Sequence, residues 1–109
     1  MSTSKNIKSI LDEYKSSVIF FSLNACIYCD KLENDLKAMQ IPYCKYNLSD
    51  QSDLREQLTS ITSRRMYPQL FIGGEFIGGY NEFVNLVSMN YEKLKAILEP
   101  LGINPEIDF

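Results

Sequence analysis

Residues 18–29 read Val-Ile-Phe-Phe-Ser-Leu-Asn-Ala-Cys-Ile-Tyr-Cys, and this stretch carries the strongest indication of the fold. Its apolar start is β-branched and aromatic and is bounded by serines, which predicts a buried strand over residues 17–22. After a short loop, Cys26 and Cys29 open a segment in which apolar residues recur at helical spacing, at Leu32, Leu36 and Met39. The stretch therefore predicts a strand, a loop and a helix that begins at a C-x-x-C pair.

The segments on either side add further elements. An amphipathic helix is predicted over residues 4–15, because apolar side chains recur there every three or four positions. The helix that follows Cys26 is expected to end near Gln40, since Pro42 disfavours helical geometry at the residue before it. A second strand is predicted over residues 43–47.

The second half of the chain predicts helices around a hairpin. Asp50 is expected to cap a third helix. Residues 69–72 and 75–77 are predicted strands joined across Gly73-Gly74, which is a strong hairpin signal. Asn81 is expected to cap another helix. The apolar positions of the helices in this half are Leu54, Leu58 and Ile61, then Phe83, Leu86 and Val87, then Leu94, Ile97 and Leu98.

The order of these elements predicts an α/β fold. The first strand–helix–strand unit implies parallel strands with a right-handed crossover, and the hairpin adds antiparallel strands. We therefore expect a four-stranded mixed β-sheet flanked by helices on both faces. The chain of 109 residues has the size of one domain, 1–109, with an irregular tail over about 100–109.

The composition argues against several classes of function. The net charge of −3 gives no electrostatic footprint for nucleic acid or for an anionic membrane. Residues 1–5 are polar, and the longest strongly apolar run, 18–21, is far too short to span a bilayer. We therefore expect a cytoplasmic protein with no nucleic-acid partner and no membrane partner.

The cysteines are the candidate reactive residues of this chain. The chain has three cysteines, an odd number, and no histidine, which removes cysteine–histidine pairs and histidine metal ligands. Cys26 and Cys29 lie one turn apart at a helix start, close enough for a disulfide. Unpaired N–H groups and the helix dipole favour a thiolate at the first cysteine. This predicts Cys26 as the nucleophile and Cys29 as the resolving thiol.

Two other interpretations of these cysteines stay open at this point. The pair could be two ordinary buried cysteines, or it could be half of a zinc site. Zinc needs four ligands, and Cys44 is the only other cysteine, so we predict no metal site. Cys44 itself is expected to be a core or half-buried thiol.

Four features together resemble the glutaredoxin family. They are the C-x-x-C after a buried strand, Tyr28 inside it, the stretch Pro-Gln-Leu-Phe-Ile-Gly-Gly at 68–74 and the stretch Phe-Ile-Gly-Gly-Tyr-Asn at 76–81. The resemblance covers residues 18–98, most of the chain. It implies a thioredoxin-like fold and glutathione as the thiol substrate.

The resemblance also implies a binding site. A cis bond before Pro68 would turn the backbone of Tyr67 toward the cysteines, where it would pair with the cysteinyl part of glutathione like an added strand. A helix N-terminus would bind the γ-glutamyl carboxylate, and an arginine would approach the glycyl carboxylate. The glutathione-binding residues implied in this way are Tyr28, Arg64, Arg65, Tyr67, Pro68, Gly79, Tyr80 and Asn81.

The sequence departs from the family pattern at four places. Ile27 stands where family members that act with two thiols usually have proline, and Met66-Tyr67 replaces the usual Thr-Val before Pro68. Leu23 stands where a basic residue is frequent. Asn81 stands where the family commonly has an aspartate. The Tyr67 ring would lie beside the active site, and one positive contact to the thiolate is missing.

Three functional hypotheses follow. The first is a monomeric enzyme that uses glutathione to reduce disulfides and glutathionylated proteins through Cys26. The second is a dimer that carries a [2Fe–2S] cluster, with Cys26 as the ligand from each chain and glutathione assisting. The third, a thioredoxin fed by a reductase, is disfavoured because thioredoxins usually carry Trp-Cys-Gly-Pro-Cys and this chain has no tryptophan.

Overall fold

Strand β1 (Val18–Ser22) lies in the interior of the sheet, and all five of its residues are buried. The computed structural model describes residues 6–106, and within them the strand order is β2-β1-β3-β4. β1 pairs in parallel with β2 (Cys44–Asn47) and antiparallel with β3 (Gln69–Ile72), which pairs antiparallel with β4 (Glu75–Gly78). The mixed four-stranded sheet predicted from the sequence is confirmed.

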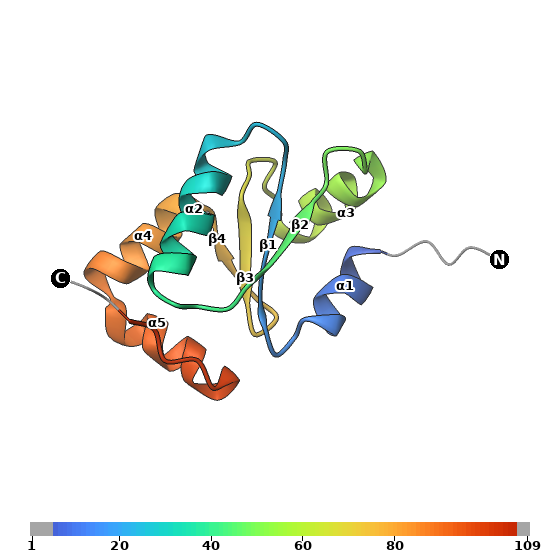
Figure 1. Ribbon diagram of the computed structural model, residues 1–109. Helices are drawn as coiled ribbons and strands as arrows, with labels where there is room; N and C mark the ends of the chain where they lie inside the picture. The colour runs from blue at the N-terminus through green and yellow to red at the C-terminus, as the bar shows by residue number, and fades with distance from the viewer. Residues whose placement is uncertain (1–5, 107–109) are drawn as a thin grey trace.

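Helices cover both faces of this sheet (Figure 1). One face carries α2, α4 and α5, and the other carries α1 and α3. Their bounds are α1 Ile7–Glu13, α2 Ile27–Ala38, α3 Ser52–Thr62, α4 Tyr80–Met89 and α5 Tyr91–Leu98, followed by a short 3₁₀ helix, Glu99–Leu101. Residues 4 and 5 of the predicted first helix lie outside the described residues.

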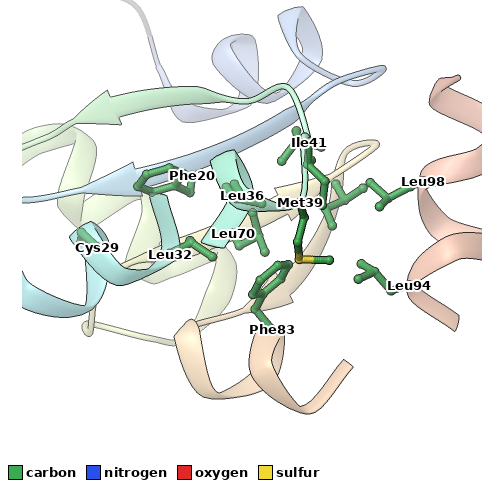
Figure 2. Close-up of a cluster of buried hydrophobic side chains, with 12 residues drawn as sticks. Phe20, Cys29, Leu32, Leu36, Met39, Ile41, Leu70, Phe83, Leu94 and Leu98 are labelled. Carbon is green, nitrogen blue, oxygen red and sulfur yellow. The ribbon is translucent and has the colours of Figure 1, made fainter. Parts of the chain in front are cut away.

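The alternation of β1 side chains produces two apolar clusters. Phe20 points into the cluster under α2, α4 and α5, whereas Phe21 points into the cluster under α1 and α3. Figure 2 shows the first cluster, in which side chains from α2, the sheet and the two C-terminal helices meet. A strand that is buried on both faces needs both layers of helices, which is why β1 is a continuous apolar run.

The hairpin between β3 and β4 turns at Gly73 and Gly74. Both glycines have positive φ angles, 62° and 82°, which side chains rarely tolerate. The predicted hairpin is therefore confirmed, with the turn at the residues expected. It returns the chain so that the end of β4 lies beside the start of β3.

Two predicted helix caps are wrong. Helix α3 begins at Ser52 with Gln51 at the N-cap and no side-chain cap, so Asp50 lies one residue too early. Arg55 instead donates to the backbone carbonyls before this helix, those of Leu48 and Ser49. In α4 the N-cap is Gly79, and Asn81 is already the second helical residue. A capping side chain must stand just before the first helical residue, which neither predicted cap does.

The C-terminal segment packs along the first cluster. The expected irregular stretch begins after the 3₁₀ turn, and Glu106 N–H donates to the carbonyl of Met39 at 2.8 Å. The Tyr91 hydroxyl donates to the carbonyl of Pro105 at 3.2 Å. The part of the predicted tail from 107 to 109 lies outside the described residues. Over residues 6–106, no helix combines the length and apolar character that crossing a bilayer requires.

Leu36→Ala is expected to lower the free energy of unfolding by about 2–5 kcal/mol, because Leu36 is fully buried in the first cluster and its loss leaves a cavity. Urea unfolding measures this difference. Asn34→Ala, on the exposed side of the same helix, is the control and should change stability by about 0.5 kcal/mol or less. Equal effects of the two substitutions would contradict the packing described for α2.

Candidate thiol–disulfide active site

Cys26 occupies the N-cap of α2. It has an extended backbone conformation, and its Sγ accepts a hydrogen bond from the N–H of Cys29 at 3.2 Å. The two cysteines form a disulfide, with their Cα atoms 5.2 Å apart. Cys29 is only 1% exposed, whereas Cys26 is half-buried. The helix N-terminus thus supports a thiolate at the cysteine that solvent can reach.

The start of β3 lies next to Cys26. The Tyr67–Pro68 peptide bond is cis, as the family resemblance implies, and the Tyr67 carbonyl oxygen lies 3.7 Å from the Cys26 Sγ. Pro68 is buried and leads directly into β3. The backbone of Tyr67 is therefore turned toward the cysteine pair.

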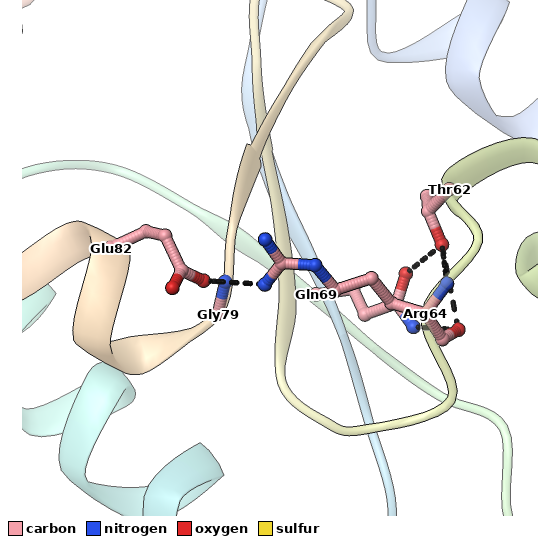
Figure 3. A network of polar contacts seen from close by, with 5 residues as sticks. All are labelled: Thr62, Arg64, Gln69, Gly79 and Glu82. Carbon is pink, nitrogen blue, oxygen red and sulfur yellow. Dashed lines mark hydrogen bonds and ion pairs between the residues drawn. The ribbon is translucent and has the colours of Figure 1, made fainter.

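A buried glutamine holds the loop before Pro68. Gln69 is 1% exposed, its amide nitrogen donates to the carbonyl of Arg64 at 2.8 Å, and its amide oxygen accepts from the Thr62 hydroxyl at 2.8 Å. Figure 3 shows this network together with the Arg64 side chain. Because the buried amide is satisfied on both sides, it fixes the backbone from which Arg64 extends.

A groove of about 400 Å³ runs from this loop to the start of α4. Its lining residues are Tyr28, Arg64, Met66, Tyr67, Pro68, Gly79, Tyr80, Asn81 and Glu82. Arg65 is not among them, because it is 72% exposed and pairs with Glu56 at 3.2 Å. The structure thus brings together all the sequence-predicted glutathione residues except Arg65.

Glu82 is a groove residue that the sequence interpretation missed. Its Oε1 accepts from the Gly79 N–H at 2.5 Å and from the Arg64 Nη1 at 2.7 Å. The hydrogen bond from Gly79, together with the Arg64 charge, lowers the pKa of the Glu82 carboxyl below its usual value, while burial opposes the shift. The signal that could have found it is its position three residues after the N-cap, where a carboxylate can reach back to the cap N–H.

Gly78 leaves room for this carboxylate. Its φ is +129°, and a Cβ there would lie 2.6 Å from the Glu82 Oε1. A side chain at position 78 would therefore both strain the backbone and push the carboxylate out of its place. The close approach of β4 to α4 depends on this glycine.

Tyr80 connects the start of α4 to α2. Its hydroxyl donates to Asp35 at 2.8 Å, and this hydrogen bond, with burial, raises the pKa of the phenol. Its ring centre lies 5.8 Å from that of Tyr28, which is 54% exposed at the rim of the groove. The two rings form one aromatic wall of the groove.

Four of the residues that depart from the family pattern are apolar or aromatic. The Tyr67 ring packs against both core clusters with its hydroxyl buried and unpaired, so burial raises the pKa of that phenol. Leu23 packs against the second cluster. Ile27 and Met66 are exposed at 70% and 80%. The ring of Tyr67 therefore faces inward as well as into the groove.

Cys44 lies away from this site. It stands at the start of β2, opposite Ile19, whereas Cys26 follows the far end of β1. The thiol is half-buried, as predicted, and a hydrogen bond with it raises the pKa of Tyr14. Nothing in this geometry brings Cys44 to the cysteine pair.

Comparisons with known proteins agree with this arrangement. The glutaredoxin family model matches residues 18–77. A glutaredoxin from Vernicia fordii is 37% identical over an alignment that covers 59% of this chain and 64% of that protein. The chain spans less than two thirds of the length of the curated relatives that it matches first.

Solved glutaredoxin structures share the thioredoxin-like fold. The holo form of glutaredoxin C1 from Populus tremula x tremuloides is 31% identical, with a TM-score of 0.71 over 85% of this chain and 98% of that one. A buckwheat glutaredoxin–glutathione complex has a TM-score of 0.72 at 24% identity, covering 93% of this chain and 97% of that one. The predicted fold class is thereby confirmed.

Glu82→Gln is expected to lower stability in a pH-dependent way. Because the pKa of Glu82 lies below its ordinary value of 4.5 in the folded protein, the ionised carboxylate stabilises the fold above that pH. This contribution is lost as the pH falls through the lowered pKa. The side chain is 39% exposed, so solvent screening keeps the difference in unfolding free energy below about 1 kcal/mol near neutral pH.

Urea unfolding of both proteins at a series of pH values, from neutral into the acid range, checks this difference, which should shrink as the pH falls through the lowered pKa and the carboxyl becomes protonated. A difference of the same size at every pH would contradict the role assigned to the charge.

Proposed function

This chain belongs to the glutaredoxin family, and on that premise we propose that it uses glutathione to reduce disulfides and protein–glutathione mixed disulfides. The observation that carries the proposal is the position of Cys26. It is the accessible member of the C-x-x-C pair and it caps α2. Its Sγ lies 3.7 Å from the carbonyl oxygen of Tyr67, a residue that lines the groove. Thiol–disulfide exchange needs a thiolate that a substrate sulfur can approach in line.

The first step is attack by the Cys26 thiolate on the glutathione sulfur of a mixed disulfide. A bond forms between these two sulfurs, the disulfide bond to the substrate protein breaks, and the protein sulfur leaves as a thiolate that takes a proton from water. The Cys29 N–H and the helix N-terminus stabilise the attacking thiolate. Leu23 supplies no charge, so these backbone groups replace the basic residue that the family often has there.

The second step restores Cys26. The thiolate of a second glutathione attacks the glutathione sulfur bound to Cys26, which yields glutathione disulfide and the free Cys26 thiolate. Alternatively, Cys29 attacks the Cys26 sulfur, forms the intramolecular disulfide and releases glutathione. The structure holds that disulfide, which supports its formation, while the burial of Cys29 favours the route through external glutathione.

The volume of the groove and the donors that line it support the proposal that glutathione is the thiol substrate. Its volume lies within the range of small-molecule sites. The backbone of Tyr67 is available for a strand-like pairing, and the first-turn N–H groups of Tyr80 and Asn81 suit a carboxylate. Arg64 is the arginine that lines the groove, so we assign the contact to a second carboxylate to Arg64 and not to Arg65.

Cys26→Ser is expected to abolish the proposed reaction, because a hydroxyl does not exchange with a disulfide. Cys29→Ser should retain activity through external glutathione, and Cys44→Ser, away from the site, is the control that should behave like the wild type. A glutathione-coupled assay on a glutathionylated substrate measures all three. Full activity in Cys26→Ser would overturn the assignment of the nucleophile.

The alternative is a glutathione-assisted dimer that carries a [2Fe–2S] cluster. Because Cys29 is buried and Cys26 is accessible, each chain would offer Cys26 as its thiolate ligand, and the groove next to it would hold the assisting glutathione. Among residues 6–106, no group of three or more His, Cys, Asp or Glu side chains lies together, so such a cluster would need a second chain.

Anaerobic reconstitution with iron, sulfide and glutathione separates the two proposals. For the enzyme proposal we expect a colourless monomer by visible absorption and size-exclusion chromatography. A coloured dimer that loses its absorption in Cys26→Ser but keeps it in Cys44→Ser would favour the cluster proposal instead.

A further inference from the structure

Glu82 accepts from two donors of the groove that suit a carboxylate. Its Oε1 accepts from the Arg64 guanidinium at 2.7 Å and from the N–H of Gly79, the N-cap of α4, at 2.5 Å (Figure 3). An arginine fork and a helix N-terminus are the groups that proteins use to bind anionic ligands. In this chain an internal carboxylate already binds the arginine and one N–H group at the start of that helix.

We propose that Glu82 is a specificity-determining residue that competes with ligand carboxylates for Arg64 and so weakens the binding of glutathione. The inference rests on the proposed function, since it concerns the same groove and the same thiol. It goes beyond that function because it assigns to Glu82 an effect on affinity that opposes the effect of its neighbour Arg64.

The side chains that line the groove have no net charge. Arg64 and Glu82 are the residues with ionised side chains among those that line it, so their charges cancel. Glutathione carries two carboxylates and one ammonium group near neutral pH, a net negative charge. A glutathione carboxylate that reaches Arg64 therefore meets a guanidinium that is already paired, and it must either displace the Glu82 carboxylate or share Arg64 with it.

The ion pair is suited to such an exchange. The side chains are 45% and 39% exposed, and pairs of this kind contribute little to stability, so a ligand carboxylate can replace Glu82 at modest cost. The backbone of Arg64 stays in place because Gln69 holds its carbonyl, and its guanidinium lies over the Phe76 ring at 5.6 Å. The arginine side chain can therefore change partner while its backbone stays fixed.

The competing carboxylate is itself held in position. The Gly79 N–H and the room left at Gly78 place Glu82 against the start of α4. A purely structural role as a helix cap would need the carbonyl-type oxygen but not the charge. Glutamine at this position keeps that oxygen and removes the charge, which separates the two roles.

The test is Glu82→Gln in steady-state assays with glutathione as the varied substrate. We expect the KM for glutathione to fall about twofold to fivefold, with kcat unchanged. A change of this size corresponds to the free energy that a half-exposed ion pair contributes. Glu56→Gln is the matched control, because Glu56 pairs with Arg65 outside the groove and its loss changes the net charge equally. Its KM should equal that of the wild type.

A double-mutant cycle with Arg64→Gln connects the effect to the ion pair. Without the guanidinium there is nothing to compete for, so Glu82→Gln should no longer lower the KM in the Arg64→Gln background. In glutathione ethyl ester the glycyl carboxylate is blocked. The decrease in KM caused by Glu82→Gln should therefore be smaller for this ester than for glutathione itself.

The remaining outcomes overturn the inference. A KM in Glu82→Gln that is unchanged or higher would mean that Glu82 orients Arg64 for the ligand or acts only as a cap. An equal decrease in the KM of Glu56→Gln would mean that the effect comes from the net charge alone and not from the pair with Arg64. If the wild type uses glutathione but Glu82→Gln does not lower the KM, this inference fails and the proposed function stands. If neither protein uses or binds glutathione, by activity and by calorimetric titration, the proposed function fails with it.

Discussion

Strand β1 is buried on both faces, and this burial dictates where the helices and the cysteine pair lie. The strand has a neighbouring strand on each side, and its apolar side chains point to both faces of the sheet. A layer of helices must therefore cover each face to keep these side chains from solvent. Phe20 and Phe21 then anchor opposite clusters. The loop that follows β1 leaves the sheet at the carboxyl end of that strand, and Cys26 lies at the end of the loop.

The strand directions bring the site together at that edge. β3 runs antiparallel to β1, with Phe21 opposite Gln69, so the start of β3 lies at the end of β1. β4 runs antiparallel to β3, with Leu70 opposite Gly78, so α4 begins there as well. Three chain segments that are distant in sequence therefore supply the cysteine pair, the Tyr67 backbone and the groove wall.

Electrostatics at this edge come mainly from the backbone and from one side-chain pair. Cys26 and Glu82 each accept an N–H at the start of a helix, so both helix N-termini already have an acceptor. The pair of Glu82 with Arg64 leaves the groove without net charge, and the exposed Met66 side chain adds apolar surface to its lining. The groove therefore presents no uncompensated charge to a ligand.

The residues alone were enough to predict the strands and helices, the strand–loop–helix context of Cys26 and Cys29 and the hairpin at Gly73-Gly74, because periodicity and turn chemistry are local. They were not enough to predict the helix caps at Gln51 and Gly79, since a shift of one residue changes which side chain can reach an N–H. The packing of the folded chain was needed to show that Arg64 lines the groove and pairs with Glu82 while Arg65 lies outside it. These partners lie 18 residues apart in sequence, and no local pattern records a contact that depends on how β3, β4 and α4 pack.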